Sequence, residues 1–527
     1  MADGGMVRLD VYSVPLAGLN LIEASAGTGK TWTIAGLYVR LVVEAAVPVD
    51  RILVVTYTKA ATEELRERIR ARLVEVRRAL EQGGGDEFCS RIIEGWSDRS
   101  EAQERLLRAV RGFDEAAIFT IHGFCQRALS DAALECGVPF ETELLADERD
   151  LVLEVTEDFW RRELAAASSL QAAAIVAAFR NPAGLASAIG SFAGRPMLPI
   201  LPPPAVDWSA AQGRYAAAFH AARESWQRDK AAVSALLLDA DGLNGNKYRK
   251  ASIPGWLTAL DVFLDSADAP LPVFDKLAKF SARELAASVK KGGTAPRHGF
   301  FELCDELVDA QAELDAALAA YLAEFRVRAL ALANAELPER KAARRLQSYE
   351  DLLTGLRSAL AGVHGGALAQ ALRARYRAAL IDEFQDTDPV QYDIFERLYG
   401  GSTLPAFLVG DPKQAIYSFR GADIFAYLKA QAAARERYTL DTNRRSTPEL
   451  IRAVNAVFGY GAQPFVYDGI HFSAAHAPPR RPEGLTVDGE AAKALHIWFL
   501  SRGADGKPLA KGAANAWCAQ ATAAEIA

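Results

Sequence analysis

The sequence has few cysteines, and their spacing excludes the common cysteine-based frameworks. Five occur among 527 residues, and no two form a C-x-x-C pair. A disulfide framework or a zinc site is therefore not expected, and isolated thiols are typical of the reducing cytoplasm. The five are Cys89, Cys125, Cys136, Cys304 and Cys518.

Long apolar runs are also missing. No stretch reaches the roughly 18 apolar residues that a membrane-spanning helix needs. The N-terminal "MADGGMVRLDVYSVPLAG" lacks the basic start and apolar core of a signal peptide. We therefore expect a cytoplasmic protein with no membrane partner.

An excess of positive charge is absent as well. The 60 Lys and Arg residues are outnumbered by 67 Asp and Glu residues, which gives a net charge of −7. Small nucleic-acid-binding domains are more often basic, so a protein that simply coats DNA is disfavoured. A motor that holds DNA in a groove is not excluded, because binding depends on the local field.

What the sequence does contain is an alternation of strand and helix patterns. Between residues 19 and 70, "LNLIEA" and "RILVVTYT" are typical of buried strands, and a helical pattern follows each. This alternation predicts an α/β fold with a parallel sheet. The second helix carries Glu64 and Arg68 at i,i+4 spacing and should end at Gly83. The first helix should bury Ile34, Leu37, Tyr38, Leu41 and Val42.

The middle of the chain changes character. Residues 141–345 are rich in Ala and Leu and read as a helical insertion, after which strand patterns return at "RAALIDEF" and "PAFLVGD". We predict one α/β domain from residues 1–140 and 346–440, a helical arm at 141–345, and a further domain that begins at 441–527. The basic residues of the arm fit either solvated helix faces or a surface for duplex DNA; they are Lys247, Arg249, Lys250, Lys276, Lys279, Lys290 and Lys291.

A phosphate-binding loop follows the first strand. "ASAGTGKT" fits G-x-x-x-x-G-K-[ST] except at its first position. Gly27 and Gly29 let backbone N–H groups surround phosphate oxygens, Lys30 adds positive charge, and the hydroxyl of Thr31 can bind Mg²⁺. The candidate nucleotide-binding residues are Ala24, Ser25, Ala26, Gly27, Thr28, Gly29, Lys30 and Thr31.

An acidic pair ends a later strand in "ALIDEFQDTD". Asp382 can hold Mg²⁺ through water, and Glu383 can orient and deprotonate the attacking water. A surface turn after a strand is the alternative for such a pair, but the phosphate loop and the following "FLVGDPKQAIYSFRGA" favour a nucleotide hydrolase.

Together these motifs resemble those of superfamily 1 DNA helicases of the UvrD/Rep type, in which the loop commonly begins with Ala. The other matching segments are "VTYTKAATEELRERI", "FTIHGFCQRAL", "SYEDLL", "LIDEFQDTDPVQYDIF", "LVGDPKQAIYSFRGAD" and "LDTNRRSTPELI". Within this family, "LIEASAGTGKT" and "IFTIHGFCQRAL" are nearly verbatim those of the RecB group, the β subunits of exodeoxyribonuclease V. The motifs cover residues 20–145 and 345–460.

The resemblance implies a RecA-like motor that uses ATP and Mg²⁺. It implies that Lys30 and Glu383 are catalytic, that Thr31 and Asp382 bind the metal, that Gln414 senses the γ-phosphate, and that Arg445 reaches it from a second motor domain. It also implies a DNA track, and bases stack on aromatic faces irrespective of sequence. Core packing is the alternative for Tyr417 and Phe419. The implied DNA-binding residues are Tyr57, Thr58, His122, Tyr417, Phe419 and Arg420.

For function, the resemblance implies 3′→5′ movement on single-stranded DNA and unwinding of duplex ends in double-strand-break repair, with RecC- and RecD-like partner subunits. Three departures qualify it. No Gln precedes the loop, Arg444 stands where the family has Tyr or Trp, and the later helicase motifs and a nuclease domain are not found. We therefore expect this chain alone to bind ATP weakly and to unwind little DNA.

Two other functions are compatible with parts of the sequence. One is a DNA-binding or assembly fragment without motor activity, which the missing later motifs favour. The other is a phosphate-loop enzyme such as a nucleotide kinase, which "FTIHGFC" and "YSFRGA" disfavour.

Overall fold

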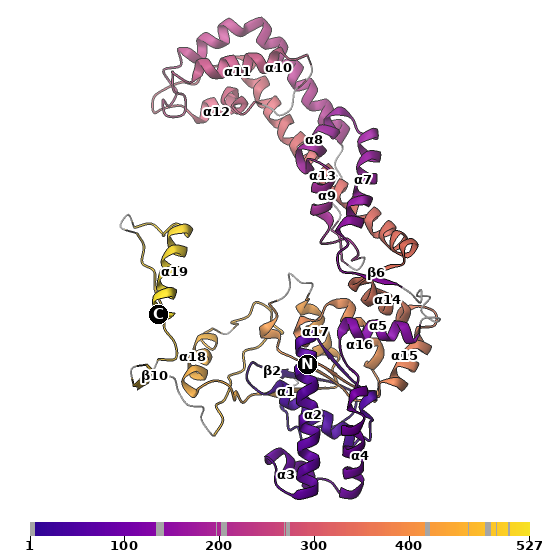
Figure 1. Cartoon of the computed structure of the whole chain (residues 1–527). Helices are drawn as coiled ribbons and strands as arrows, with labels where there is room; N and C mark the ends of the chain where they lie inside the picture. The colour runs from indigo at the N-terminus through magenta and orange to yellow at the C-terminus, as the bar shows by residue number, and fades with distance from the viewer. Residues whose placement is uncertain are drawn as a thin grey trace. The chain divides into compact units, whose positions relative to one another are not determined.

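The structure is a computed structural model of the chain. It describes residues 6–526 except 133–141, 196–197, 202–207, 268, 270–273, 417–421, 462, 480–485, 488, 492 and 504–505. The chain divides into two compact units (Figure 1). One consists of Met1–Phe140 with Leu352–Ala527, and the other is Glu141–Asp351.

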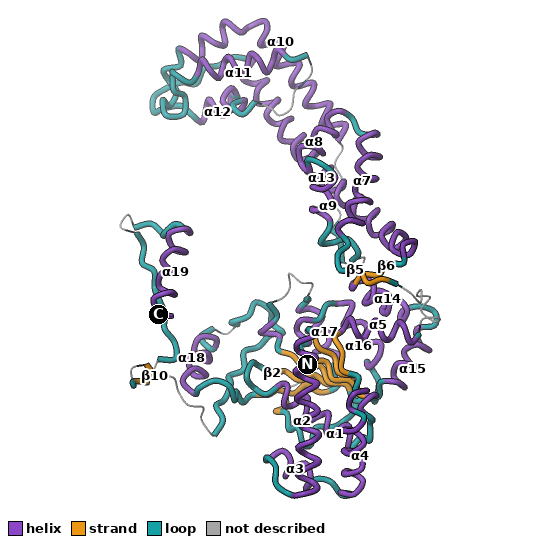
Figure 2. The backbone as a smooth tube through the Cα atoms, in the orientation of Figure 1, coloured by secondary structure: helices purple, strands orange, loops and turns teal. Residues whose placement is uncertain are grey.

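The first unit is built on a seven-stranded sheet whose strand pairs are all parallel (Figure 2). Strands that are far apart in the sequence lie side by side in this sheet, since β8 and β9 are the two neighbours of β2. In spatial order the strands are β1 (Val7–Arg8), β9 (Glu436–Leu440), β2 (Leu19–Ala24), β8 (Ala406–Gly410), β7 (Ala378–Ile381), β3 (Ile52–Thr56) and β4 (Ile118–Thr120).

Both faces of this sheet are covered by helices, as a parallel sheet requires. Successive side chains of a strand point to opposite faces, so Ile22 and Val54 join one core while Leu21 and Leu53 join the other. The first core contains α1 (Lys30–Val43), α2 (Lys59–Gln82), α3 (Glu87–Glu94) and α4 (Arg99–Arg111). The second contains α5 (Ile121–Asp131), α14 (Tyr349–Ala361), α15 (Gly365–Arg375), α16 (Pro389–Tyr399) and α17 (Ile424–Ala433).

The predicted α/β fold with a parallel sheet is confirmed. The helix α2 ends at Gln82, with Gly83 as its C-cap, and Arg68 pairs with Glu64 at 2.9 Å. Ala24 ends β2 and is fully buried, so a small side chain is what the core accepts at the entry to the loop. The five residues predicted for the buried face of α1 are all in the core.

The second unit is helical, and the 46-residue helix α13 (Gly299–Arg344) belongs to both of its hydrophobic clusters. One cluster includes α10 (Trp208–Leu238), α11 (Ile253–Asp265) and α12 (Ala282–Ala287). The other includes α7 (Arg149–Ala166), α8 (Ser169–Phe179) and α9 (Pro182–Ile189). A short parallel pair, β5 (Glu143–Leu145) and β6 (Leu346–Ser348), joins the two ends of the segment.

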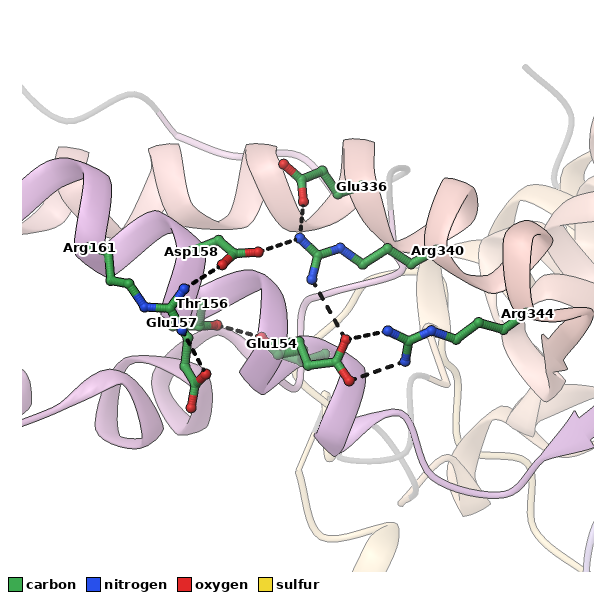
Figure 3. Close-up of polar contacts among 9 residues, drawn as sticks. Glu154, Thr156, Glu157, Asp158, Arg161, Glu336, Arg340 and Arg344 are labelled. Atoms are coloured by element: carbon green, nitrogen blue, oxygen red, sulfur yellow. Dashed lines mark hydrogen bonds and ion pairs between the residues drawn. The ribbon is translucent and has the colours of Figure 1, made fainter.

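Ion pairs connect α7 to the C-terminal part of α13 (Figure 3). Arg340 lies 2.8 Å from Asp158, and Arg344 lies 2.7 Å from Glu154. Such solvent-exposed pairs each contribute little, so the apolar cluster around Phe325 supplies most of the stability and the ion pairs fix the register.

Most of the seven basic residues named above lie in exposed connections between helices rather than on helix faces. They are solvated, as one of the two interpretations expects, and contact with duplex DNA stays a prediction. Lys247, Arg249 and Lys250 lie in the connection between α10 and α11, and Lys290 and Lys291 follow α12. Several are ion-paired: Lys250 with Asp241 at 2.7 Å and Lys279 with Glu284 at 3.0 Å. These connections are not helical because they contain Gly, Asn and Pro, which end helices.

The remaining described elements follow the sheet: α18 (Pro448–Phe458), the antiparallel pair β10 (Thr486–Val487) and β11 (Glu490–Ala491), and α19 (Lys511–Ile526). No single described helix is long and apolar enough to cross a membrane. The bent pair α8 and α9, with 63° between its members, meets the length and composition test only when the two are taken together.

Candidate nucleotide-hydrolysis site

The phosphate loop connects β2 to α1 through a tight turn. Thr28 closes this turn, since its backbone N–H and its hydroxyl both donate to the carbonyl of Ser25, at 3.2 and 2.7 Å. Gly27 and Gly29 adopt φ values of +79° and +96°, which are left-handed and favour glycine. The positions of both glycines are therefore required by the backbone path.

The helix α1 begins at Lys30, with Gly29 as its N-cap and no acidic residue in its first turn. Unsatisfied N–H groups and the positive end of the helix dipole therefore face the loop without a competing carboxylate. Lys30 and Thr31 lie in this first turn. The arrangement is suited to an anion with several oxygens, such as a polyphosphate.

The segment after β9 lies directly against the loop. The N–H of Arg444 donates to the carbonyl of Gly27 at 2.7 Å, and the amide oxygen of Asn443 accepts from the N–H groups of Arg445 and Ser446 at 2.9 Å each. A Cβ on Gly27 would approach that oxygen to 2.6 Å. The predicted Arg445 is therefore brought to the loop, although the two motifs are far apart in sequence.

The acidic pair follows β7 and faces the same loop. The ammonium of Lys30 lies 2.8 Å from the carboxylate of Glu383. Glu383 has a φ of +50°, an uncommon conformation for a residue with a side chain, and such strain is concentrated at functional sites. Burial, followed by the charge of Glu383, raises the pKa of Asp382 to about 6.

A continuous chain of hydrogen bonds leads from this pair to the third motif. The side-chain amide of Gln385 donates to Glu383 at 2.7 Å, and its oxygen accepts from the N–H of Asp411 at 2.9 Å. The carboxylate of Asp411 accepts from the amide of Gln414 at 2.6 Å. Here Gln385 lies in the short helix η4 (Phe384–Asp386) and Gln414 in η5 (Pro412–Gln414). The nucleotide site and the predicted γ-phosphate sensor are thus physically linked.

The chemistry of the donors fits a magnesium ion. Thr31 offers a hydroxyl oxygen and Asp382 a carboxylate oxygen, which are the hard ligands that Mg²⁺ takes alongside substrate phosphates. Two adjacent carboxyl groups at the end of one strand repel each other, and this repulsion adds to burial in raising the pKa of Asp382. A divalent cation would relieve that repulsion.

A cavity of about 620 Å³ adjoins the loop. Its walls include Tyr12, Trp32, Arg91 and Arg444, with Thr28 and Gly29 at the phosphate side. The guanidinium of Arg91 lies 3.8 Å from the centre of the Tyr12 ring. This volume is in the range of small-ligand sites, and planar aromatic and guanidinium groups are suited to stacking on a base.

The predicted DNA-binding residues have different outcomes. Tyr57 and Thr58 follow β3, and His122 lies in the first turn of α5 directly after β4, so all three lie at the carboxyl edge of neighbouring strands. Thr58 caps α2 by accepting from the N–H of Ala61 at 3.1 Å. Burial lowers the pKa of His122, so its imidazole is neutral at physiological pH. The other three, Tyr417, Phe419 and Arg420, lie outside the described residues.

Several residues of the site were not singled out from the sequence. Gln385, Asp411 and Asn443 stand inside the quoted motifs, and their fixed spacing from Glu383, Gln414 and Arg445 was the available signal. Other residues of the cavity, such as Tyr12 and Arg91, come from segments without a motif, so no local pattern points to them.

Comparison with known proteins agrees with this geometry. The family model described as the UvrD/REP helicase N-terminal domain matches residues 11–435. The chain belongs to the UvrD/Rep helicase family. This membership accounts for the alanine at position 24 and for the order of the motifs along the chain.

Individual relatives within the family are RecB subunits. The chain is 37% identical to the RecBCD enzyme subunit RecB of Escherichia coli K12 over 98% of its own length and 44% of that protein. It is 31% identical to the subunit from Haemophilus influenzae, over 89% of the chain and 42% of the relative. It is 29% identical to the subunit from Mycobacterium tuberculosis H37Rv, over 83% of the chain and 29% of the relative. The chain thus spans less than half the length of these relatives.

The contact between Gly27 and the segment 443–445 predicts that Gly27→Ala lowers nucleotide affinity at least about tenfold, which is about 1.4 kcal/mol. The added methyl group would meet both Asn443 and Arg445, and the positive φ would be strained. Titration with a fluorescent ATP analogue measures the effect. Gly84→Ala is the matched control, since Gly84 has a similar φ of +84° and no neighbour within 4 Å. Equal affinities for both variants would contradict this role of Gly27.

The raised pKa of Asp382 predicts a pH-dependent stability. Because the folded pKa of about 6 exceeds the ordinary value of 3.8, the ionised carboxylate destabilises the fold, and this effect grows through pH 4–6 and is complete above that. We expect Asp382→Asn to raise the melting temperature of the nucleotide-free and magnesium-free protein, with a gain that is larger at pH 8 than at pH 5. A gain that is independent of pH would contradict the assignment.

Proposed function

We propose that this chain supplies the first motor domain of an ATP-dependent 3′→5′ DNA helicase of the RecB type. The observation that carries the proposal is the hydrogen-bonded path from Lys30 through Glu383, Gln385 and Asp411 to Gln414. It joins the phosphate loop to the motif that leads into "YSFRGA". A nucleotide kinase has no need of such a link, whereas a motor must couple its nucleotide to its track.

In this proposal each residue of the site has a defined task in hydrolysis. The N–H groups of residues 27–31 and the Lys30 ammonium bind the β- and γ-phosphates, so that Lys30 exchanges its Glu383 partner for phosphate oxygens. Glu383, released from that ion pair, accepts a proton from the attacking water. Arg445 adds positive charge at the γ-phosphate as negative charge develops there. Mg²⁺, held by Thr31 and Asp382, would neutralise phosphate charge.

The cavity beside the loop is proposed to hold the base. Tyr12 and Arg91 form a stacked pair at its wall, and Arg444 offers a second planar guanidinium. An arginine can stack on a ring in place of the Tyr or Trp that the family uses. We propose that these planar groups hold the base by stacking, since no glutamine precedes the loop.

The remaining assignments extend this proposal to the DNA. Tyr57, Thr58, His122, Tyr417, Phe419 and Arg420 would contact single-stranded DNA, and residues 441–527 would begin the second motor domain. The contact of Asn443 and Arg444 with the phosphate loop supports a nucleotide bound between the two motor domains. We also propose that the helicase unwinds duplex DNA ends, works with RecC- and RecD-like partner subunits and is located in the cytoplasm.

The decisive substitution is Lys30→Ala. We expect ATP hydrolysis to disappear, with a loss of at least about a hundredfold, because the γ-phosphate loses its principal charge partner. Binding of an oligo(dT) strand without nucleotide should stay within about twofold, since Lys30 lies on the nucleotide side. Colorimetric phosphate release and fluorescence anisotropy measure the two quantities. Arg68→Ala, which removes an exposed ion pair on α2, is the control. Hydrolysis that survives in the K30A protein would rule out this site as the motor.

A further inference from the structure

A buried ion triad lies beside the nucleotide site, and its central residue, Lys413, has no part in the assignments above. The ammonium of Lys413 contacts the carboxylate of Glu23 and lies 2.8 Å from that of Asp411. The side chains are 11%, 6% and 2% exposed, respectively. Three charged groups are therefore held together away from water.

The position of these carboxylates explains why a cation is needed. Glu23 is the penultimate residue of β2 and pairs in register with Gly410 of the neighbouring β8, directly before Asp411. Two acidic side chains thus meet at adjacent strand ends. Burial alone would lower the pKa of Lys413, but the charges of Glu23 and Asp411 outweigh it and raise that pKa. The lysine is charged, and its removal would leave two buried carboxylates facing each other.

The carboxylate of Asp411 connects Lys413 to the site, because it contacts both Lys413 and Gln414. One of its oxygens accepts from both the backbone N–H and the ammonium of Lys413, at 3.1 and 2.8 Å. The other oxygen accepts from the amide of Gln414 at 2.6 Å. The orientation of the Gln414 amide thus depends on a carboxylate that Lys413 fixes, and Glu23 in turn anchors Lys413 to the strand that enters the phosphate loop.

We propose that Lys413 is a positioning residue that ties the phosphate-loop strand to Gln414 and so sets the energetic coupling between nucleotide and DNA. The inference rests on the proposed function, because it takes Gln414 as the residue that senses the γ-phosphate. Lys413 itself acts through Asp411. It is distinct from Lys30, whose partner is Glu383 on the other side of the hydrogen-bonded path.

The test is a linkage measurement on the 527-residue protein, which needs no unwinding activity. The affinity for oligo(dT) is measured by anisotropy without nucleotide, with ATPγS and Mg²⁺, and with ADP and Mg²⁺. The ratio of affinities with and without ATPγS reports the coupling, for which a value on the order of 10 is typical. We expect Lys413→Met to bring this ratio below about 2, while the oligo(dT) affinity measured with ADP and Mg²⁺ stays within about twofold of the parent.

The matched control is Lys341→Met in the helical unit. Lys341 is also a buried lysine between two carboxylates, at 3.0 Å from Glu148 and 2.6 Å from Asp351, and its side chain is 4% exposed. Its loss should lower the melting temperature and leave the coupling ratio unchanged. A merely structural role for Lys413 would make the two variants behave alike.

Glu23→Gln provides a second, isosteric variant if the K413M protein does not fold. It removes the anchor of Lys413, and we expect it to lower the coupling ratio about threefold or more. The positioning role would be overturned if the K413M protein had the same coupling ratio as the parent protein. If the K413M protein does not fold, the same ratio in the E23Q protein would overturn it. A ratio of about 1 in the parent protein would instead overturn the proposed function, and the positioning role with it.

Discussion

The ion pair between Lys30 and Glu383 joins residues that are 353 positions apart in the sequence, and the site is organised around it. It exists because β2, β8 and β7 are parallel neighbours, so that their carboxyl ends meet at one edge of the sheet. At that edge the phosphate loop, the acidic pair and the third motif each leave a strand. The insertion of more than two hundred residues between β4 and β7 does not disturb this, since the second unit has hydrophobic clusters of its own.

The same edge holds an unusual density of charge for a protein interior. Burial raises the pKa of Asp382 to about 6, Glu383 is in a left-handed conformation, and Glu23 and Asp411 share Lys413. The raised pKa of Asp382 and the left-handed Glu383 both oppose folding, and the apolar faces of the sheet supply the stability that tolerates them. In the proposed motor this local instability would be useful, because groups that repel one another can exchange partners when phosphate and metal enter and leave.

The sequence was sufficient to predict the parallel sheet, the loop and the acidic pair, because each has a local pattern. The approach of Arg445 to the loop was expected only from the family resemblance. Strand runs such as "LNLIEA" and the ending of α2 at Gly83 follow from side-chain periodicity and backbone preference. Contacts between separate motifs have no such pattern. The tie between Gln385 and Asp411, the Lys413 triad and the stacking of Arg91 on Tyr12 depend on strand order and register, which only the folded chain provides. That most of the named basic residues of the arm lie in connections rather than on helix faces was not predicted either.

We propose that Lys30 and Glu383 belong to one hydrolytic site in which Glu383 activates water. This proposal is tested by single-turnover hydrolysis of ATP by a Glu383→Gln variant, with ATP affinity measured in parallel. ATP should still bind within a few-fold of the parent affinity, because glutamine keeps the shape of the side chain. The hydrolysis rate should fall by at least about a hundredfold, the scale of a lost general base. A variant that hydrolyses ATP at nearly the parental rate would rule out Glu383 as the base.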